Sequence, residues 1–277
     1  MISKKRKIIG WIVSSILAIV ITIFAAIYQR TTGPTYPKSI TTEINGKLYS
    51  FKLARSHSTS SDCEITVPMN DNEVRGFLIY RPFPTNYKWD TVAMNKTSDG
   101  MSAFLPKQLA AGKLEYFLLF RTGEKAFPLL AETPNVIRFK GDVPGYILIP
   151  HIIFMFFAMM LSNLAGLLAG FKIDKARLWA FITFVGILCG GMILGPIVQK
   201  FAFNEFWTGV PYGWDLTDNK TLIAFVAWII ALLANRKKFR PGYIIAAAIV
   251  TLAIFSIPHS MFGSQLNHAT GAVMTGK

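Results

Sequence analysis

The chain has 277 residues, of which 52% are hydrophobic and only 16% are charged, and its formal net charge is +14. Because soluble domains contain about 25% charged residues, this composition excludes an ordinary soluble protein. A basic protein can bind nucleic acid, but here the basic residues cluster at the ends of apolar runs, where they set membrane topology. We therefore expect the lipid bilayer, and no nucleic acid, as a partner. With only Cys63 and Cys189, a disulfide framework is excluded.

The charged residues divide the chain into parts with different surroundings. Residues 31–145 contain 14 basic and 11 acidic residues, as a soluble domain does, whereas residues 146–277 contain only four acidic ones. We predict an N-terminal transmembrane anchor at residues 1–30, an extracytoplasmic β-sandwich-like domain at 31–145, a four-helix transmembrane bundle at 146–260 with an outer loop at 199–220, and an extracytoplasmic C-terminal tail at 261–277.

Five apolar runs are candidates for transmembrane helices, which need about 20 mostly apolar residues each. The first, residues 8–28, follows four basic residues and is longer than the apolar core of a signal peptide, so we expect an uncleaved anchor. The other four are residues 148–170, 178–198, 221–235 and 242–258. The sequence thus predicts an α-helical membrane bundle of about five transmembrane helices.

Basic residues fix the orientation of these helices. They precede the first run and fill the connections between the second and third runs and between the fourth and fifth runs. The positive-inside rule places all three clusters in the cytoplasm. The β domain, the loop 199–220 and the C-terminal tail then share the extracytoplasmic side.

The fourth run is too short to cross a bilayer. Either its helix extends into residues 218–220, or the preceding loop dips into the membrane interface. Trp207, Tyr212 and Trp214 favour the second alternative, since aromatic rings settle at the depth of the headgroups.

The third run contains glycines at positions 186, 190, 191 and 195. Small residues four apart let helices approach closely. We therefore predict that the third helix is tightly packed at the centre of the bundle.

The middle domain shows strand signals separated by turn residues. Asn45-Gly46 is a strong two-residue hairpin turn between residues 40–44 and 47–53. Further strands are predicted at residues 63–67, 74–80, 114–121 and 135–140. About seven short strands at this spacing indicate an antiparallel sandwich. The domain contains no catalytic motif, and an enzymatic activity is not assigned.

The predicted topology gathers polar residues at the outer membrane face. His151 opens the second run, His259 closes the fifth, and Glu205 and Asp215 lie in the outer loop. Imidazole and carboxylate groups bind transition metals, and thioethers favour Cu(I). We therefore predict a metal site, with copper as a candidate, formed by His151, His259, Asp215 and Glu205. Additional soft or outer ligands would come from Met155, Met159, Met261, Asp218 and His268.

A structural interpretation of the same residues stands beside the metal hypothesis. Asp218 is placed to cap the N-terminus of the fourth helix, with Thr217 as the alternative cap. Methionines are ordinary packing residues. A histidine beside a proline at an interface often binds only backbone or lipid headgroups.

Several segments carry a resemblance. Residues 195–199 (GPIVQ), 206–209 (FWTG), 215–221 (DLTDNKT) and 258–264 (PHSMFGS) resemble segments of a family of bacterial polytopic inner-membrane proteins. The resemblance implies the inner membrane of a bacterium and implies no function, because that family has no established activity.

Three functions remain open from the sequence. The first is a metal-dependent or redox protein whose site lies where the bundle meets the β domain. The second is a non-catalytic scaffold or assembly factor that binds a membrane or periplasmic protein through the β domain. A small transporter is the third, and it is disfavoured because the apolar runs contain almost no polar residue near mid-membrane.

Overall fold

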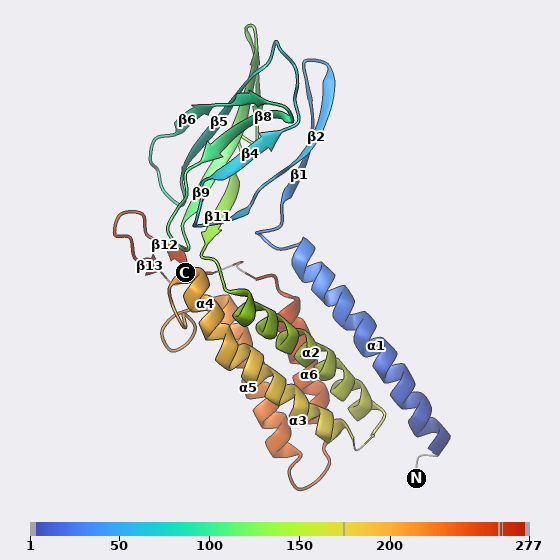
Figure 1. Ribbon diagram of the computed structural model, residues 1–277. Coiled ribbons are helices and arrows are strands. Elements are labelled where there is room, and N and C mark those ends of the chain that lie inside the picture. Colours follow the sequence, from blue (N-terminus) through green and yellow to red (C-terminus); the bar gives the residue numbers. More distant parts are fainter. Residues whose placement is uncertain (1–3, 174, 260, 262, 275–277) are drawn as a thin grey trace.

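A computed structural model describes residues 4–173, 175–259, 261 and 263–274. Figure 1 shows β-sheets stacked on one end of a helical bundle. The helices are α1 (Lys4–Thr31), α2 (Gly145–Gly170), α3 (Ala176–Ile187), α4 (Gly195–Phe203), α5 (Leu216–Ala234) and α6 (Pro241–Ser256). A π-helical segment, η1 (Leu188–Leu194), joins α3 to α4. We call the end of the bundle that meets the sheets the domain end and the opposite end the far end.

Four helices in the described part of the chain are long and apolar enough to cross a membrane: Lys7–Thr31, Gly145–Gly170, Ala176–Phe203 and Leu216–Ala234. The second of these is 26 residues long, which at about 1.5 Å per residue exceeds the hydrocarbon thickness. The fifth apolar run forms the shorter helix α6. The chain is therefore an integral membrane protein, and each of the five predicted runs corresponds to a helical rod.

The central helix of the bundle is α2, which contacts α1, α3, α4 and α6. The prediction that the third run occupies the centre is wrong, because this rod packs along one side of α2. Its glycines do permit close approach. A Cβ atom added at Gly190 would lie 2.7 Å from Phe154 Cβ, and one at Gly191 would lie 2.6 Å from Thr221 Cγ2.

Helix α5 begins at Leu216, five residues before the predicted start, and is 19 residues long. The alternative in which the helix extends is thus correct, and the loop that precedes it is shorter than predicted. Asp215 is the N-cap, and its Oδ1 accepts a hydrogen bond from Thr217 N at 2.8 Å. The predicted caps, Asp218 and Thr217, are wrong because both residues already lie in the first helical turn.

The strands form four sheets, which we together call the β region, and one of these sheets comes from the C-terminal residues. They are β1 (Lys38–Ile44), β2 (Lys47–Leu53), β3 (Ser56–Ser58), β4 (Cys63–Val67), β5 (Arg75–Pro82), β6 (Asp90–Ala93), β7 (Asn95–Thr97), β8 (Gly100–Leu105), β9 (Lys113–Thr122), β10 (Lys125–Leu129), β11 (Asn135–Lys140), β12 (Gln265–Leu266) and β13 (Val273–Met274). The hairpin β1–β2, the sheet β4-β8-β7 and the pair β12–β13 stand beside a six-stranded sheet of order β3-β11-β9-β5-β6, in which β10 pairs with β9.

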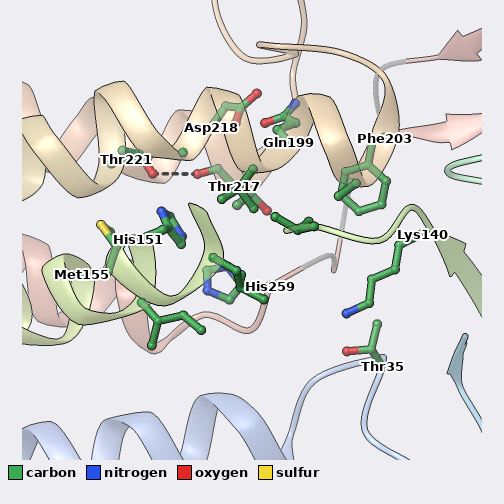
Figure 2. A pocket seen from close by; sticks show the side chains of 18 of the residues that line it. Thr35, Lys140, His151, Met155, Gln199, Phe203, Thr217, Asp218, Thr221 and His259 are labelled. Carbon is green, nitrogen blue, oxygen red and sulfur yellow. Dashed lines mark hydrogen bonds between the residues drawn. The ribbon is translucent and has the colours of Figure 1, made fainter. Parts of the chain in front are cut away.

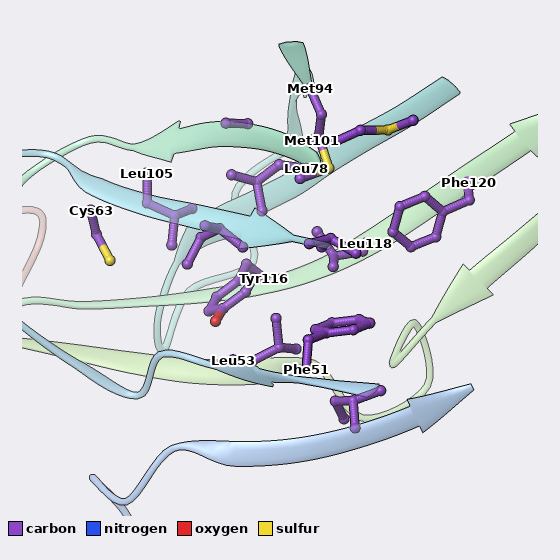
Figure 3. Packing of buried hydrophobic residues seen from close by; sticks show 14 of the residues in the cluster. Phe51, Leu53, Cys63, Leu78, Met94, Met101, Leu105, Tyr116, Leu118 and Phe120 are labelled. Atoms are coloured by element: carbon purple, nitrogen blue, oxygen red, sulfur yellow. The ribbon is translucent and has the colours of Figure 1, made fainter. Parts of the chain in front are cut away.

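One hydrophobic core joins the larger sheets of the β region. Phe51 comes from the hairpin, Cys63 and Leu105 come from β4 and β8, and Phe120 comes from β9, so all three sheets contribute (Figure 3). The hydroxyl of Tyr116, which is fully buried, donates to Ala54 O at 2.8 Å. The core therefore buries apolar groups and satisfies the phenol that it contains.

The six strands predicted by residue range are all present, and the hairpin turn at residues 45–46 is confirmed. The sheets are not wholly antiparallel, because β3 pairs with β11 in parallel. In this pairing β3 lies at the edge of the six-stranded sheet, beside the strand that leads directly into α2.

A short C-terminal segment ties the β region to the bundle. Leu266 N donates to Ala111 O at 3.1 Å, on the side of the sheets. Ser264 accepts a hydrogen bond at its carbonyl from Arg138 Nη2 at 2.6 Å, and its N and Oγ donate to Asp215 Oδ2 at 2.9 and 3.0 Å. A backbone hydrogen bond from Gly141 N to Ala202 O makes a second connection. These contacts fix β11 against α4 and α5.

Candidate functional site

The described residues enclose a pocket of about 620 Å³ at the domain end of the bundle, which we call the junction pocket. Residues from α1, α2, α4, α5, β11 and the segment after α6 line it (Figure 2). A volume of this size accommodates a small-molecule ligand. The pocket lies between the β region and the helices, so neither part forms it alone.

The half of helix α2 that lines this pocket is partly exposed. All of its buried residues lie at or after Ala158, so its neighbours cover the first half of the helix less completely than the second. Ile152 and Phe156 both line the pocket, although 44% and 53% of their surfaces are exposed. These side chains form a wall between the pocket and the surface that faces the membrane.

The course of helix α1 explains why the first half of α2 is less covered than the second. At the far end of the bundle, Gly10 packs closely on Phe171 and Ile173, just beyond α2. Midway along, Asn163 Nδ2 donates to Thr22 Oγ1 at 3.0 Å. At the domain end, Gln29 Nε2 donates to Phe255 O, the last turn of α6. Helix α1 thus crosses from α2 towards α6, and the pocket occupies the space that this divergence leaves.

His151 is oriented by the π-helical segment. Its Nδ1 lies 2.8 Å from the carbonyl oxygen of Gly190. Because a carbonyl oxygen can only accept, Nδ1 carries the proton of that hydrogen bond, and in the neutral ring Nε2 is the basic nitrogen. Short π-helical segments inside α-helices occur frequently at functional sites. Here the segment supplies the carbonyl group that fixes the tautomer of His151.

His259 faces His151 across the same pocket, and Figure 2 shows both rings among its lining side chains. No hydrogen bond joins the His259 ring to another of the described residues. The side chain of His259 is exposed to the pocket, yet the protein around it lowers its pKa, and the charges of Lys220 and His151 lower that pKa further, while Asp215 raises it. We therefore expect His259 to be neutral at pH 7.

The two aspartates of this region serve the structure. Asp215 caps α5 and holds Ser264. Asp218 Oδ2 accepts hydrogen bonds from Thr208 N at 2.6 Å and from Thr208 Oγ1 at 3.1 Å, and Gln199 Nε2 donates to the same Thr208 hydroxyl. Both carboxylates line the pocket, yet their oxygens already bind the loop before α5 and the C-terminal segment. This explains their burial without a metal ion.

Two basic residues that the sequence did not single out are buried at the pocket. Lys220 is 2% exposed and Arg138 is 5% exposed, and both line the pocket. A signal for Lys220 was present, since it lies one turn inside an apolar helix, where ionisable residues are rare and functional. Arg138 lies in an ordinary strand, and it is buried because the C-terminal segment and the ring of Phe203 cover it.

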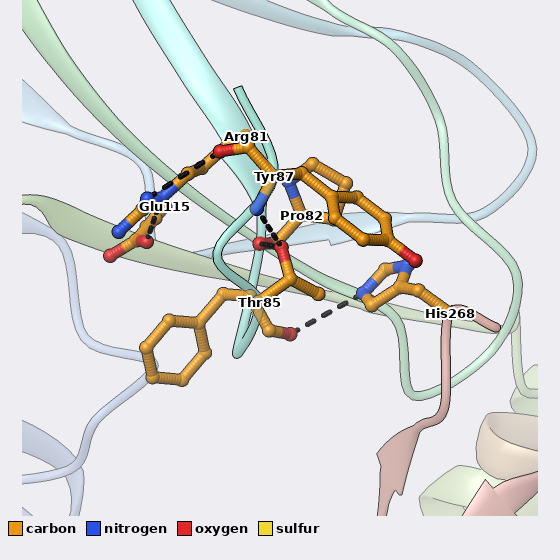
Figure 4. Close-up of polar contacts among 7 residues, drawn as sticks. Arg81, Pro82, Thr85, Tyr87, Glu115 and His268 are labelled. Atoms are coloured by element: carbon orange, nitrogen blue, oxygen red, sulfur yellow. Dashed lines mark hydrogen bonds and ion pairs between the residues drawn. The ribbon is translucent and has the colours of Figure 1, made fainter. Parts of the chain in front are cut away.

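The predicted ligands do not all meet at one place. The structure places His151, His259, Asp215, Asp218, Met155 and Met159 on the junction pocket. Glu205 and Met261 are exposed and do not line it. His268 lies on the β region, where its Nε2 is 3.3 Å from Phe83 O, next to the Arg81–Glu115 ion pair of β5 and β9 (Figure 4).

Within the described residues, no group of three or more His, Cys, Asp and Glu side chains is arranged to hold a metal ion. The metal hypothesis therefore lacks support from ligand geometry and stays a prediction. No protein-family model, no curated protein and no solved structure matches this chain. The functional argument consequently depends on the junction pocket itself.

Proposed function

We propose that this integral membrane protein binds a membrane-derived amphiphile in the junction pocket. The observation that carries the proposal is that Ile152 and Phe156, on the less covered first half of α2, line the pocket and stay largely exposed, so one wall of the pocket consists of apolar side chains. A molecule with one polar and one apolar end matches such a pocket. A lipid can reach it sideways from the bilayer, without crossing water.

The lining of the pocket combines two kinds of chemistry. Ala26, Leu148, Ile152, Met155 and Phe255 supply apolar surface. The charged side chains of β11 and the first turn of α5, together with the two histidines, supply polar groups. Apolar chains gain free energy by burial against the first set, at about 25 cal/mol per Å². Polar headgroups find hydrogen-bond partners in the second set.

The basic residues indicate how the protein is oriented in the membrane, and hence on which side the pocket lies. The N-terminal helix begins at the far end of the bundle (Figure 1). At the same end, Arg177 in the first turn of α3 donates to Arg236 O of the α5–α6 connection. By the positive-inside rule that end faces the cytoplasm. The β region is then extracytoplasmic, and the pocket draws its ligand from the outer leaflet of a bacterial inner membrane.

Photolabelling tests the proposal. Purified protein in lipid nanodiscs would be irradiated with a photoreactive fatty acid, and the labelled peptides identified by mass spectrometry. We expect labels on residues that line the pocket, such as Ile152 and Met155. The variant Ile152→Trp, which fills the opening, should lose these labels. Ile149→Trp is the matched control, because Ile149 is 58% exposed on the same helix and does not line the pocket. Labelling spread evenly around the bundle would contradict the proposal.

A metal ion is the second candidate ligand of the pocket, and the orientation of His151 favours it. With Nδ1 bound to a backbone carbonyl, Nε2 is directed as in metal-binding histidines, and Met155 and His259 line the same space (Figure 2). Copper is the metal that this set would suit best. Metal analysis of the purified protein, with His151→Ala beside it, tests this candidate, and metal-free wild-type protein would exclude it. The partner-binding scaffold stays a prediction.

A further inference from the structure

Lys220 is a buried cation that forms no ion pair with any described carboxylate. Its Nζ donates one hydrogen bond, to Ile257 O at 2.7 Å, although an ammonium group has three donors. Across the described residues, no carboxylate oxygen lies within 4 Å of it. A buried charge without an ion-pair partner is destabilising, so an anion that enters the pocket would stabilise this side chain.

Arg138 is a second buried cation in this pocket that forms no ion pair within the described part of the chain. Its guanidinium lies over the ring of Phe203, with 4.2 Å from Cζ to the ring centroid, and Nη2 donates to Ser264 O. Its Nε is buried and has no hydrogen-bond partner in the described structure. Burial lowers the pKa of Arg138 to about 10, and the charge of Asp215 opposes this shift. The group is therefore charged at pH 7 and keeps unused hydrogen-bonding capacity.

The carboxylates of the pocket form no ion pair with these two cations. Asp215 accepts three hydrogen bonds and Asp218 accepts two, all from backbone or hydroxyl groups. Asp142 is exposed at the rim, where it accepts a hydrogen bond from Ser58 Oγ. Four cationic side chains, Arg30, Arg138, Lys140 and Lys220, line the pocket against these three carboxylates. The net charge of the lining is thus positive by one.

We propose that the junction pocket selects amphiphiles with an anionic headgroup, a carboxylate or a phosphate, which binds Lys220 and Arg138 while the apolar chain lies along α2. This inference rests on the proposed function and adds the class of ligand. Phosphate and carboxylate groups both accept charge-assisted hydrogen bonds, and an arginine that retains unused N–H groups suits them. A zwitterionic headgroup would bring a quaternary ammonium group towards the two buried cations.

Competition against the photoreactive fatty acid tests the inference in nanodiscs of the full chain. The competitors are lysophosphatidic acid, lysophosphatidylcholine with the same acyl chain, and inorganic phosphate. We expect lysophosphatidic acid to compete about tenfold or more better than lysophosphatidylcholine, since a charge-assisted hydrogen bond contributes about 1.5–3 kcal/mol. Lys220→Met and Arg138→Met should remove this preference. Lys200→Met is the matched control, because Lys200 lies at the same end of the bundle, donates to Asn204 O and does not line the pocket.

The outcomes separate the two proposals. Equal competition by the two lysolipids in the wild-type chain would overturn the anionic selectivity and leave the amphiphile pocket standing. Competition by inorganic phosphate at the same concentration as lysophosphatidic acid would overturn the role of the apolar chain. If wild-type protein shows no pocket labelling at all, the proposed function itself is wrong. Should Lys220→Met fail to fold, the wild-type competition series still decides, because it compares ligands on one unaltered chain.

Discussion

The core of the β region and the junction pocket bury opposite kinds of side chain. In the core, three sheets bury apolar side chains, and the phenol of Tyr116 finds an acceptor. At the junction, two cations and two carboxylates are buried within one pocket, and Lys220 and Arg138 lack counter-ions within 4 Å. The first arrangement stabilises a fold. The second reduces stability and is retained where a ligand can compensate for it.

The stability of the two regions also depends on different conditions. A core of apolar contacts needs nothing beyond the chain. A pocket with uncompensated charge depends on salt, pH and the composition of the membrane. Substitutions in the two regions should therefore differ in whether added ligand rescues them.

The largest effect is expected in the β core. Phe120→Ala removes a fully buried ring and should destabilise the β region by about 3–5 kcal/mol. Denaturant unfolding followed by tryptophan fluorescence measures this loss. Phe104→Ala on β8 is the matched control, because Phe104 is 51% exposed and its loss should change stability by less than about 0.5 kcal/mol. Rescue of Phe120→Ala by an anionic lipid would show that the two regions are not independent.

Asp215→Ala should have the next largest effect. The substitution removes the cap of α5 and the two hydrogen bonds that hold Ser264, and so it loosens the connection between bundle and β region. Loss of a cap alone costs about 0.5–2 kcal/mol, and we expect about 2–3 kcal/mol in total with the buried hydrogen bonds. Thermal unfolding in detergent measures it.

Glu205→Ala is the control for Asp215→Ala, since Glu205 is an exposed acid in the same loop. Equal destabilisation by the two substitutions would mean that Asp215 acts only through its negative charge. Limited proteolysis of the C-terminal segment adds a second measurement. Faster cleavage in Asp215→Ala alone would support its role as the connection.

The periodic elements of this fold could be predicted from sequence, and the elements without periodicity could not. Strands such as β4 and β9 alternate buried and exposed residues or carry β-branched and aromatic runs. Strand β8 was missed because both of its faces are covered, so five of its six residues are buried and no alternation appears. Strands β3 and β7 have only three residues each and depend on their neighbours.

The candidate site shows the same division. Topology alone brought His151 and His259 to one level of the membrane, and the structure places both on the junction pocket. The burial of Arg138 could not be predicted, because it requires residues 263–264, which are 125 or more positions away in the chain, to close over β11. The cap of α5 was misplaced by three residues, since Asp215 and Asp218 share the same local chemistry and only the loop contacts of Asp218 distinguish them.

Lys220→Met should separate stability from binding. Removing a buried charge often leaves stability unchanged or raises it, so we expect a gain of up to about 1 kcal/mol in detergent together with the loss of anionic preference. Thermal unfolding with and without lysophosphatidic acid measures both quantities. Wild-type protein should be stabilised by the lipid and the variant should not. A variant that is strongly destabilised without ligand would instead assign Lys220 to the structure, through its hydrogen bond to Ile257 O.

The last effect concerns pH and His259. Its pKa is lowered in the folded protein by the surrounding protein and by the charges of Lys220 and His151. An unfolded histidine has a pKa of about 6.5, so the contribution of the neutral ring to stability is complete above that pH. As pH falls towards the folded pKa, the unfolded state binds the proton first and stability declines. The charge of Asp215 opposes this shift but is the weakest of these influences.

His259→Gln, which cannot titrate, should remove this decline between about pH 6.5 and 5, while His57→Gln should leave it unchanged. His57 is the control because it does not line the junction pocket, although its neighbour Ser56 on β3 does. Thermal unfolding across the pH range measures the slope. If the ligand is anionic, protonation of His259 adds a positive charge to the pocket, so bound lipid should reduce the decline in the wild-type protein. An unchanged slope in the presence of lipid would place the headgroup away from His259, nearer to Arg138.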